Sequence, residues 1–204
     1  MKLASWALAL LVVVCGPALA ADNPTSESLD RVLGKATAPL TVIEYASMTC
    51  PHCAHLHEDV MPSIKSDWID TGKVKLIYRD FPTNPVGMAV GVGMITQCAP
   101  KEQYFPILGL LFKAQDRWLH SQDPLSEIKR TVGLAGLTPG DVDTCLKREE
   151  LGNAIQARAE EGLKQYGISS TPTLVVDGKR YEGELTYPQI KKAFEAAYAK
   201  VAKK

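Results

Sequence analysis

The stretch that decides the fold, residues 40–53, reads L-T-V-I-E-Y-A-S-M-T-C-P-H-C. Its first part, residues 40–45, is rich in β-branched and aromatic side chains and predicts a buried β-strand. A short turn leads to C-P-H-C at residues 50–53, and residues 51–69 predict a helix. A strand that delivers a C-x-x-C pair to the first turn of a helix is the arrangement of a dithiol redox site.

The position of each residue in this motif has a physical reason. The first N–H groups of a helix have no intrahelical partner and lie at the positive end of its dipole, so a thiolate at Cys50 is stabilised there. Pro51 suits the first helical turn, because it has no N–H to leave unsatisfied. His52 adds a donor or a positive charge beside the sulfur. Cys53 lies three residues on, on the same helical face. We therefore expect Cys50 to be the exposed, attacking sulfur and Cys53 the inner, resolving sulfur.

Two other interpretations of the motif stay open. A zinc site is one, because two cysteines and three histidines lie within eight residues, namely Cys50, His52, Cys53, His55 and His57. These side chains point around a helix instead of converging, and no second C-x-x-C completes a tetrahedron, so we expect no metal. A purely structural bond between the two cysteines is the other, and so short a loop constrains the unfolded chain little.

The first 20 residues predict a cleaved signal peptide. Lys2 gives a positive start, an apolar run follows, and Pro-Ala-Leu-Ala ends in a small-residue cleavage site, with the cut after Ala20 or Ala21. The apolar run is short for a membrane span. We therefore expect export to the periplasm or another extracytoplasmic compartment.

Removal of the first 20 of 204 residues leaves 184, enough for one elaborated domain. It also leaves 22 basic against 23 acidic residues, because Lys2 departs. That balance gives no electrostatic case for binding nucleic acid or an anionic membrane.

Four of the five cysteines remain after cleavage, and an even number in an exported chain favours disulfides. Cys98 and Cys145 have no C-x-x-C partner, so we predict a structural disulfide between them. Its loop of about 48 residues contributes on the order of 3–4 kcal/mol in the loop-entropy account. A second redox pair is the alternative.

Glu44 is an isolated acid in the apolar strand, six residues before Cys50. Burial there is costly, and such a group is suited to proton transfer with the inner thiol, Cys53. The alternative is a partly solvated acid at the end of the strand. His55 and His57, in the helix that follows, are expected to be exposed surface histidines.

The rest of the chain divides into a helical stretch and a returning sheet. A second strand is predicted over residues 73–81, and helices fill residues 85–165, a span too long for a loop. We therefore predict domain segments at 21–84 and 166–204, interrupted by the helical insertion. Residues 168–176 are predicted to run from a turn through a proline into a strand. A hairpin turn at Asp177-Gly178, a return strand over residues 179–182 and a helix from about 187 to 202 complete the chain.

Pro172 stands at the head of the returning strand and is expected to be cis and beside Cys50. A cis bond after Thr171 exposes backbone groups that can pair with an extended peptide, as another strand would. An ordinary proline at a strand start is the alternative. We therefore assign Thr171 and Pro172 to substrate binding.

With these features the mature chain resembles the DsbA family of exported thiol:disulfide oxidoreductases along nearly its whole length. The resemblance implies an α/β, thioredoxin-like fold with a helical domain inserted into it. It implies Cys50 as nucleophile, Cys53 as resolving thiol, His52 as stabiliser of the Cys50 thiolate, Glu44 as the buried acid and Pro172 as the cis-proline.

The resemblance also implies a strongly oxidising disulfide that is donated to reduced or partly unfolded exported proteins. Reoxidation by a quinone-linked membrane oxidase of the DsbB type follows, with no cofactor beyond the cysteine pair, and we expect a monomer. Thr171 departs from the valine of the family's best-known oxidase. A disulfide isomerase or reductase kept reduced by a membrane donor, and a non-catalytic peptide-binding or metal-handling protein, are the alternatives.

Overall fold

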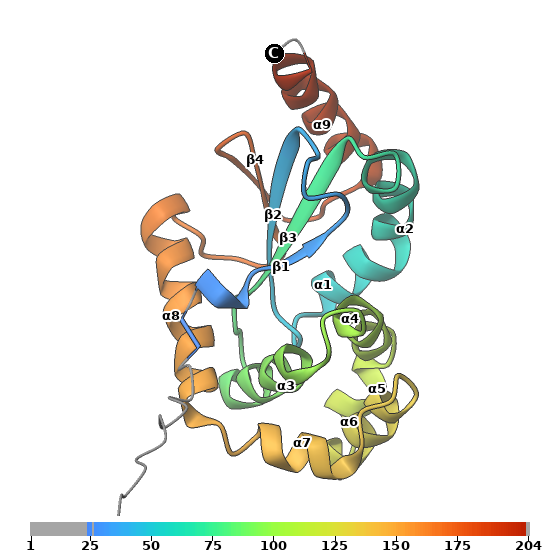
Figure 1. Ribbon diagram of the computed structural model, residues 1–204, viewed down its shortest axis with the longest axis vertical. Helices are drawn as coiled ribbons and strands as arrows, with labels where there is room; N and C mark the ends of the chain where they lie inside the picture. Colours follow the sequence, from blue (N-terminus) through green and yellow to red (C-terminus); the bar gives the residue numbers. More distant parts are fainter. Residues whose placement is uncertain (1–23, 26, 203–204) are drawn as a thin grey trace, which may run out of the picture.

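The computed structural model describes residues 24–25 and 27–202, so the predicted signal peptide lies outside the described residues. A five-stranded sheet of order β1-β3-β2-β4-β5 forms the centre of the molecule (Figure 1). β2 runs parallel to β3, and every other neighbouring pair is antiparallel. The strands are β1 (Arg31–Leu33), β2 (Leu40–Ala46), β3 (Val74–Asp80), β4 (Thr173–Val176) and β5 (Lys179–Glu182). The sheet therefore combines an early and a late part of the chain, as the predicted thioredoxin-like fold requires.

β2 is the central strand and is almost wholly buried. Its side chains alternate between the two faces of the sheet, as strand geometry dictates. Val42 packs with Phe194 and Leu56 on one face, whereas Tyr45 packs with Ile168 on the other. Both faces are covered, which explains why this strand reads as a nearly continuous apolar run.

The helical segment predicted over residues 51–69 is present but changes pitch twice. It consists of α1 (Pro51–His55), η2 (Leu56–Val60), α2 (Met61–Ile64) and η3 (Lys65–Ile69), of which η2 and η3 are π-helical. Pro62 has no N–H to donate, and the N–H of Met61 bonds the carbonyl of Leu56 one turn back in a widened loop. Widened turns of this kind accommodate a proline within a helix.

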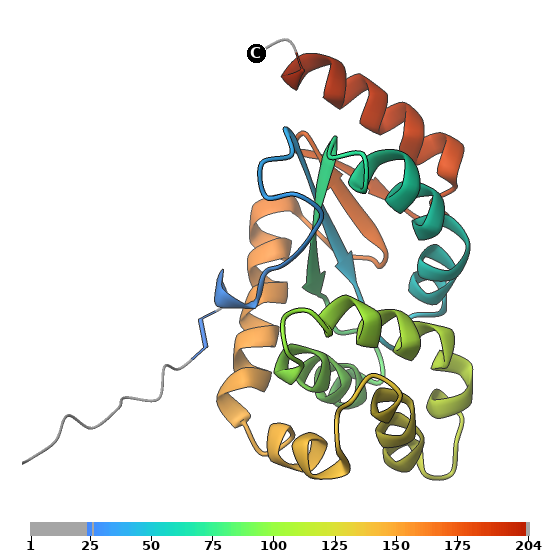
Figure 2. The same cartoon turned by 45° about the vertical axis from the view of Figure 1, so that its right-hand side comes forward.

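Six helices follow β3 and pack at one end of the sheet and along its side (Figures 1 and 2). They are α3 (Val86–Cys98), α4 (Tyr104–Lys113), α5 (Gln115–Leu119), α6 (Pro124–Gly133), α7 (Pro139–Cys145) and α8 (Glu149–Tyr166). Asp123 caps α6 and Thr138 forms a capping box at α7. Residues 146–148 are not helical and separate α7 from α8.

α8 extends back from the helical layer and lies along the sheet (Figure 2). A Cβ on Gly162 would lie 2.4 Å from the ring of Tyr45, so only glycine permits this approach to β2. Two buried arginines, Arg79 of β3 and Arg158 of α8, share the carboxylate of Asp30. Because α8 belongs to both layers, the domain boundaries at 84/85 and 165/166 stay a prediction.

The chain returns to the sheet through β4 and β5, joined by the predicted Asp177-Gly178 turn. Both turn residues have positive φ, 50° and 73°, which matches a tight hairpin. α9 (Tyr187–Val201) then covers the face of β2 opposite α8, behind a capping box at Thr186. No helix within residues 24–25 and 27–202 combines the length and the apolar character needed to cross a bilayer.

Candidate active site

Cys50 lies in the connection between β2 and α1 and is the N-cap residue of that helix. The carbonyl of Cys50 accepts the N–H groups of Cys53 and Ala54 at 3.1 and 3.3 Å. Its thiol donates to the backbone carbonyl of Thr171, with Sγ and the oxygen 3.3 Å apart. Cys50 is 9% exposed and Cys53 not at all, so the predicted order of outer and inner sulfur is correct, although Cys50 is more covered than expected.

The two free thiols have opposite electrostatic surroundings. Hydrogen bonding from the Cys53 thiol, from the side chain of Thr171 and from the N–H groups of Cys53 and His52 lowers the pKa of Cys50 to about 5, against the effect of burial. Burial raises the pKa of Cys53 far above its usual range, and the neighbouring Cys50 and Glu44 add to this. At neutral pH the pair therefore holds one thiolate, at Cys50, and one thiol, at Cys53.

The peptide bond between Thr171 and Pro172 is cis, as predicted. It precedes β4, which pairs directly with β2, so the loop before β4 lies beside the start of α1. The hydrogen bond from Cys50 to Thr171 establishes this contact across 121 residues of sequence. Thr171 is partly exposed, whereas Pro172 is buried. The structure thus brings the predicted peptide-binding residues to the outer sulfur.

Glu44 is fully buried, which excludes the partly solvated alternative. Its Oε1 lies 2.8 Å from Nε2 of His57, a side chain that is only 9% exposed. The ring of His57 stacks on Phe112 of α4, with centroids 4.3 Å apart. The prediction that His57 is a surface histidine is therefore wrong. The spacing of Cys53, His57 and Val60 already places His57 on the buried face of its helix.

The other two histidines near the motif, His52 and His55, are exposed. His55 is exposed and pairs with Asp59 at 2.7 Å, as expected of a surface residue. His52 is also exposed, and its backbone N–H is the group that acts on Cys50. Among the residues that the structure describes, no three acidic, histidine or cysteine side chains gather as a metal site would require. The cysteines and histidines considered above for zinc thus diverge in space.

Two residues that the motif does not contain hold the loop before Cys50 in place. Gln115 of α5 donates from Nε2 to the carbonyls of Met48 and Cys50, at 2.8 and 3.0 Å. The N–H of Ser47 reaches Sγ of Cys53 at 3.4 Å, and its hydroxyl accepts the N–H of Thr83. A glutamine inside a helix carries no sequence signal for such a role, so Gln115 was not predictable.

Cys98 and Cys145 form the predicted disulfide, with Cα atoms 6.1 Å apart. It joins the last residue of α3 to the last residue of α7, within the helical layer. Cys145 is 2% exposed and packs with Leu151 and Ile155 of α8. This second pair therefore fastens three helices together.

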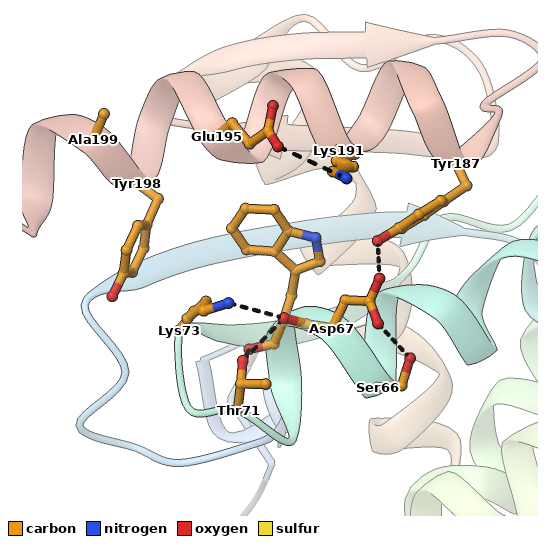
Figure 3. A pocket seen from close by; sticks show the side chains of 10 residues that line it. Ser66, Asp67, Thr71, Lys73, Tyr187, Lys191, Glu195, Tyr198 and Ala199 are labelled. Atoms are coloured by element: carbon orange, nitrogen blue, oxygen red, sulfur yellow. Dashed lines mark hydrogen bonds and ion pairs between the residues drawn. The ribbon is translucent and has the colours of Figure 1, made fainter.

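A concavity between α9 and η3 holds several charged side chains (Figure 3). Its charges are satisfied within the protein: Lys191 pairs with Glu195, Tyr187 donates to Asp67, and Lys73 donates to a backbone carbonyl. None of the residues that line it is a cysteine or histidine. It therefore has no part in the site at Cys50.

Comparison with known proteins agrees with this geometry. A family model described as Thioredoxin matches residues 26–196. A Rickettsia typhi protein named as a protein-disulfide oxidoreductase is 27% identical over 155 residues, which cover 75% of this chain and 56% of the relative. Disulfide bond formation protein D of Bacillus subtilis is 25% identical over 172 residues, covering 80% of this chain and 75% of that protein. The chain thus spans little more than half the length of the Rickettsia relative.

Solved structures give the same result. The crystal structure of alpha-DsbA1 of Wolbachia pipientis superimposes with a TM-score of 0.77 at 27% identity, covering 88% of this chain and 98% of that one. BdbD of Bacillus subtilis has a TM-score of 0.75 at 22% identity, over 83% of this chain and 93% of its own, and shows the shared fold. Both superpositions cover more than four fifths of this chain.

Proposed function

The chain belongs to the thioredoxin family and is DsbA-like, and we propose that it is a protein disulfide oxidoreductase that donates its Cys50–Cys53 disulfide to reduced proteins. One observation carries this proposal: the Cys50 sulfur lies at the start of α1, against the carbonyl that precedes cis-Pro172, with its pKa lowered to about 5. A thiolate so stabilised is a good leaving group, which favours transfer of the disulfide to the substrate.

The proposed reaction takes place in two exchanges. A substrate thiolate attacks Sγ of Cys50, the bond between Cys50 and Cys53 breaks, and Cys53 takes up a proton. A second substrate thiolate then attacks the substrate sulfur of the mixed disulfide and expels Cys50 as a thiolate. The substrate loses two electrons and the enzyme gains them. The electrons move only between sulfurs, so the reaction we propose needs no cofactor beyond the cysteine pair.

We further propose that Thr171 and Pro172 hold the substrate as an extended segment. The backbone of Thr171 lies beside the outer sulfur, since its carbonyl accepts a hydrogen bond from the Cys50 thiol. An extended peptide laid here would pair with backbone groups, whatever its side chains. That mode of binding suits reduced or partly unfolded proteins of many sequences.

The compartment and the partners are proposed on similar grounds. A buried disulfide between Cys98 and Cys145 is typical of proteins that fold in an oxidising compartment, in keeping with the predicted signal peptide. We therefore propose a periplasmic or other extracytoplasmic location, a monomer, and reoxidation by a quinone-linked membrane oxidase of the DsbB type.

Reduced, unfolded ribonuclease provides the test. The oxidised protein is expected to restore ribonuclease activity while one Cys50–Cys53 disulfide is consumed per disulfide formed. Mixed with scrambled ribonuclease, which carries disulfides, the reduced Cys53→Ala variant is expected to accumulate a mixed disulfide: the Cys50 thiolate opens a ribonuclease disulfide, one ribonuclease sulfur leaves as a thiolate, and no Cys53 is present to resolve the product. Absence of both results would overturn the proposal.

A disulfide isomerase or reductase is the second candidate, because a threonine stands directly before cis-Pro172 and hydrogen bonding from its side chain helps to lower the pKa of the outer sulfur. Scrambled ribonuclease separates the two activities. If the reduced protein rescues scrambled ribonuclease much faster than the oxidised protein oxidises reduced ribonuclease, the isomerase is favoured.

A further inference from the structure

Cys53 must gain and lose a proton in each cycle, yet it has no contact with solvent. It is 0% exposed, and its Sγ accepts the N–H of Ser47 at 3.4 Å. Glu44 of β2 is also 0% exposed, and its charge contributes to the raised pKa of Cys53. Any proton that reaches Cys53 through this acid therefore needs a third group that connects the acid with water.

The two oxygens of Glu44 have different surroundings. Oε1 lies 2.8 Å from Nε2 of His57. Oε2 is buried and, within the part of the chain that the structure describes, has no hydrogen-bond partner. An unpartnered buried carboxylate oxygen is costly, and such groups in native proteins call for a functional explanation. Oε2 is the oxygen of Glu44 left free to exchange a proton.

His57 joins Glu44 to the surface. Its ring lines a largely apolar groove of about 560 Å³ between the segment η2–α2 and α4. The walls include Met61, Phe105 and Leu108, with Lys65 among the lining residues. Stacking on Phe112 fixes the orientation of the ring, and 9% of the side chain stays accessible. One nitrogen of an imidazole can take up a proton while the other releases one. A ring that lines the groove can therefore pass a proton between Glu44 and water.

We propose that His57 relays protons between this groove and Glu44, and that Glu44 exchanges them with Cys53. The inference rests on the proposed function. When Cys53 attacks Cys50 in a mixed disulfide, the Cys53–Cys50 bond forms and the partner leaves as a thiolate. The proton of Cys53 passes to Oε2 of Glu44, and Oε1 delivers a proton to Nε2 of His57, which releases one to water in the groove. Disulfide opening runs the same transfers in reverse.

The ionisable groups around His57 are few. Glu44 faces it from β2, Tyr78 faces it from β3 with ring centroids 6.1 Å apart, and Lys65 shares the groove. Burial raises the pKa of Tyr78 well above its usual range, so the phenol stays neutral. Lys65 is held by Asp70 at 2.7 Å. α4 places the apolar ring of Phe112 against His57, and the α4 residues that line the groove, Phe105, Pro106, Leu108 and Gly109, carry no ionisable group. A change in the pH profile on mutation of His57 would therefore report on its pair with Glu44.

The test uses the reduced full-length protein and 5,5′-dithiobis(2-nitrobenzoate) in stopped flow from pH 5 to 9. A first phase reports attack by Cys50, and a second phase reports expulsion of the second thiolate by Cys53. His57→Gln is expected to leave the first phase within about twofold and to slow the second about tenfold, a modest part of the ~10²–10⁴ that proton transfer contributes. The pH profile of the second phase is expected to flatten. His55→Gln, at an exposed histidine two residues away, is the matched control.

Two further variants separate a relay from a structural role. His57→Phe keeps a ring to stack on Phe112 and loses the relay, so it is expected to slow the second phase as His57→Gln does. His57→Ala opens the site to the groove, and added imidazole is expected to restore its second phase. In Glu44→Gln the His57→Gln change is expected to add nothing.

A second phase unchanged in all three His57 variants, or equal slowing of both phases, would overturn the relay. A wild-type protein without a fast first phase would instead contradict the proposed function, so the two failures are distinguishable.

Discussion

The two cysteine pairs of this protein are chemically alike and structurally opposite. Cys50 and Cys53 lie three residues apart at the head of α1, with their pKa values driven in opposite directions. Cys98 and Cys145 lie 47 residues apart in sequence and join the ends of two helices. The first pair meets the groups that change the charge of a sulfur, namely helix N–H groups, a carbonyl and a buried acid. The second meets packed side chains of α8. The surroundings, and not the residue type, make one pair suited to exchange and the other to fastening.

The largest expected effect separates the pairs by activity. Cys50→Ala is expected to reduce oxidation of ribonuclease to the uncatalysed rate, because Cys50 is the sulfur that contacts Thr171 and the remaining free thiol, Cys53, is fully buried. The double variant Cys98→Ser/Cys145→Ser is expected to keep at least half of the wild-type rate at 25 °C. Loss of activity in the double variant with retained fold would show that the second pair takes part in exchange.

The second effect separates the pairs by stability. Cys98→Ser/Cys145→Ser is expected to lower the free energy of unfolding by about 3–4 kcal/mol, because the unfolded chain regains the freedom of a 48-residue loop. Reduction of the Cys50–Cys53 disulfide alone is expected to cause no comparable loss in the free energy of unfolding, because the loop that this disulfide closes is short. Urea denaturation of the oxidised wild type and the double variant measures the difference. Equal midpoints would contradict the assignment of the second pair as a fastening.

Much of the exchange site could be predicted because its determinants are local. One short stretch of sequence contains the strand before Cys50, the proline at the first helical position and Glu44, six residues before Cys50. The caps Asp123 and Thr138 likewise depend on neighbouring residues alone. Local chemistry of this kind is readable without knowledge of the fold. The confirmed cis bond at Pro172 is different, because a place at the head of a strand also fits an ordinary proline, and it was the resemblance to the DsbA family that implied the cis form.

The rest depends on contacts between distant segments. Asp30, Arg79 and Arg158 form one ionic group from three parts of the chain, and no spacing relates them. Gln115 reaches the loop before Cys50 only because α5 packs there. The prediction for His57 was wrong although its spacing places it on the buried face of its helix. Its polar side chain suggested exposure to solvent, and its partner Glu44 lies in another element. A polar residue on a buried face needs its partner to be interpretable.

A third effect, smaller per pH unit, concerns pH and belongs to the first pair alone. The pKa of Cys50 is lowered to about 5 in the folded reduced protein, against about 8.5 for an unfolded cysteine. The resulting stabilisation is complete above pH 8.5 and is lost as pH falls to 5. Cys53, whose pKa is raised, stays neutral in that window and contributes only above it.

The stability of the reduced protein relative to the oxidised protein is therefore expected to fall by at most about 1.4 kcal/mol per pH unit between pH 8 and pH 5. Urea denaturation of both forms across this range measures it, and the oxidised form, in which neither thiol titrates, is the control. Parallel stability curves would mean that the Cys50 thiolate is not stabilised by folding.

The smallest expected effect concerns Gln115 of α5, which connects the helices that follow β3 with the loop before Cys50. Gln115→Ala removes the donor to the carbonyls of Met48 and Cys50 from a side chain that is 5% exposed. The Cys50 carbonyl keeps the N–H groups of Cys53 and Ala54, so chiefly the Met48 carbonyl loses its partner. We expect a loss of about 1–2 kcal/mol in the free energy of unfolding, the cost of one unsatisfied buried acceptor.

The matched control for Gln115→Ala is Gln156→Ala, whose amide bonds only a carbonyl of its own helix, that of Gly152. The control is expected to change stability by no more than about 0.5 kcal/mol. The thiolate absorbance of Cys50 is expected to keep its midpoint in both variants, because Gln115 contacts the backbone oxygen and not the sulfur. A shifted midpoint in Gln115→Ala alone would show that α5 also sets the charge of the sulfur. The helical layer would then act on the exchange pair directly, and the division between the two cysteine pairs would be less complete than their surroundings indicate.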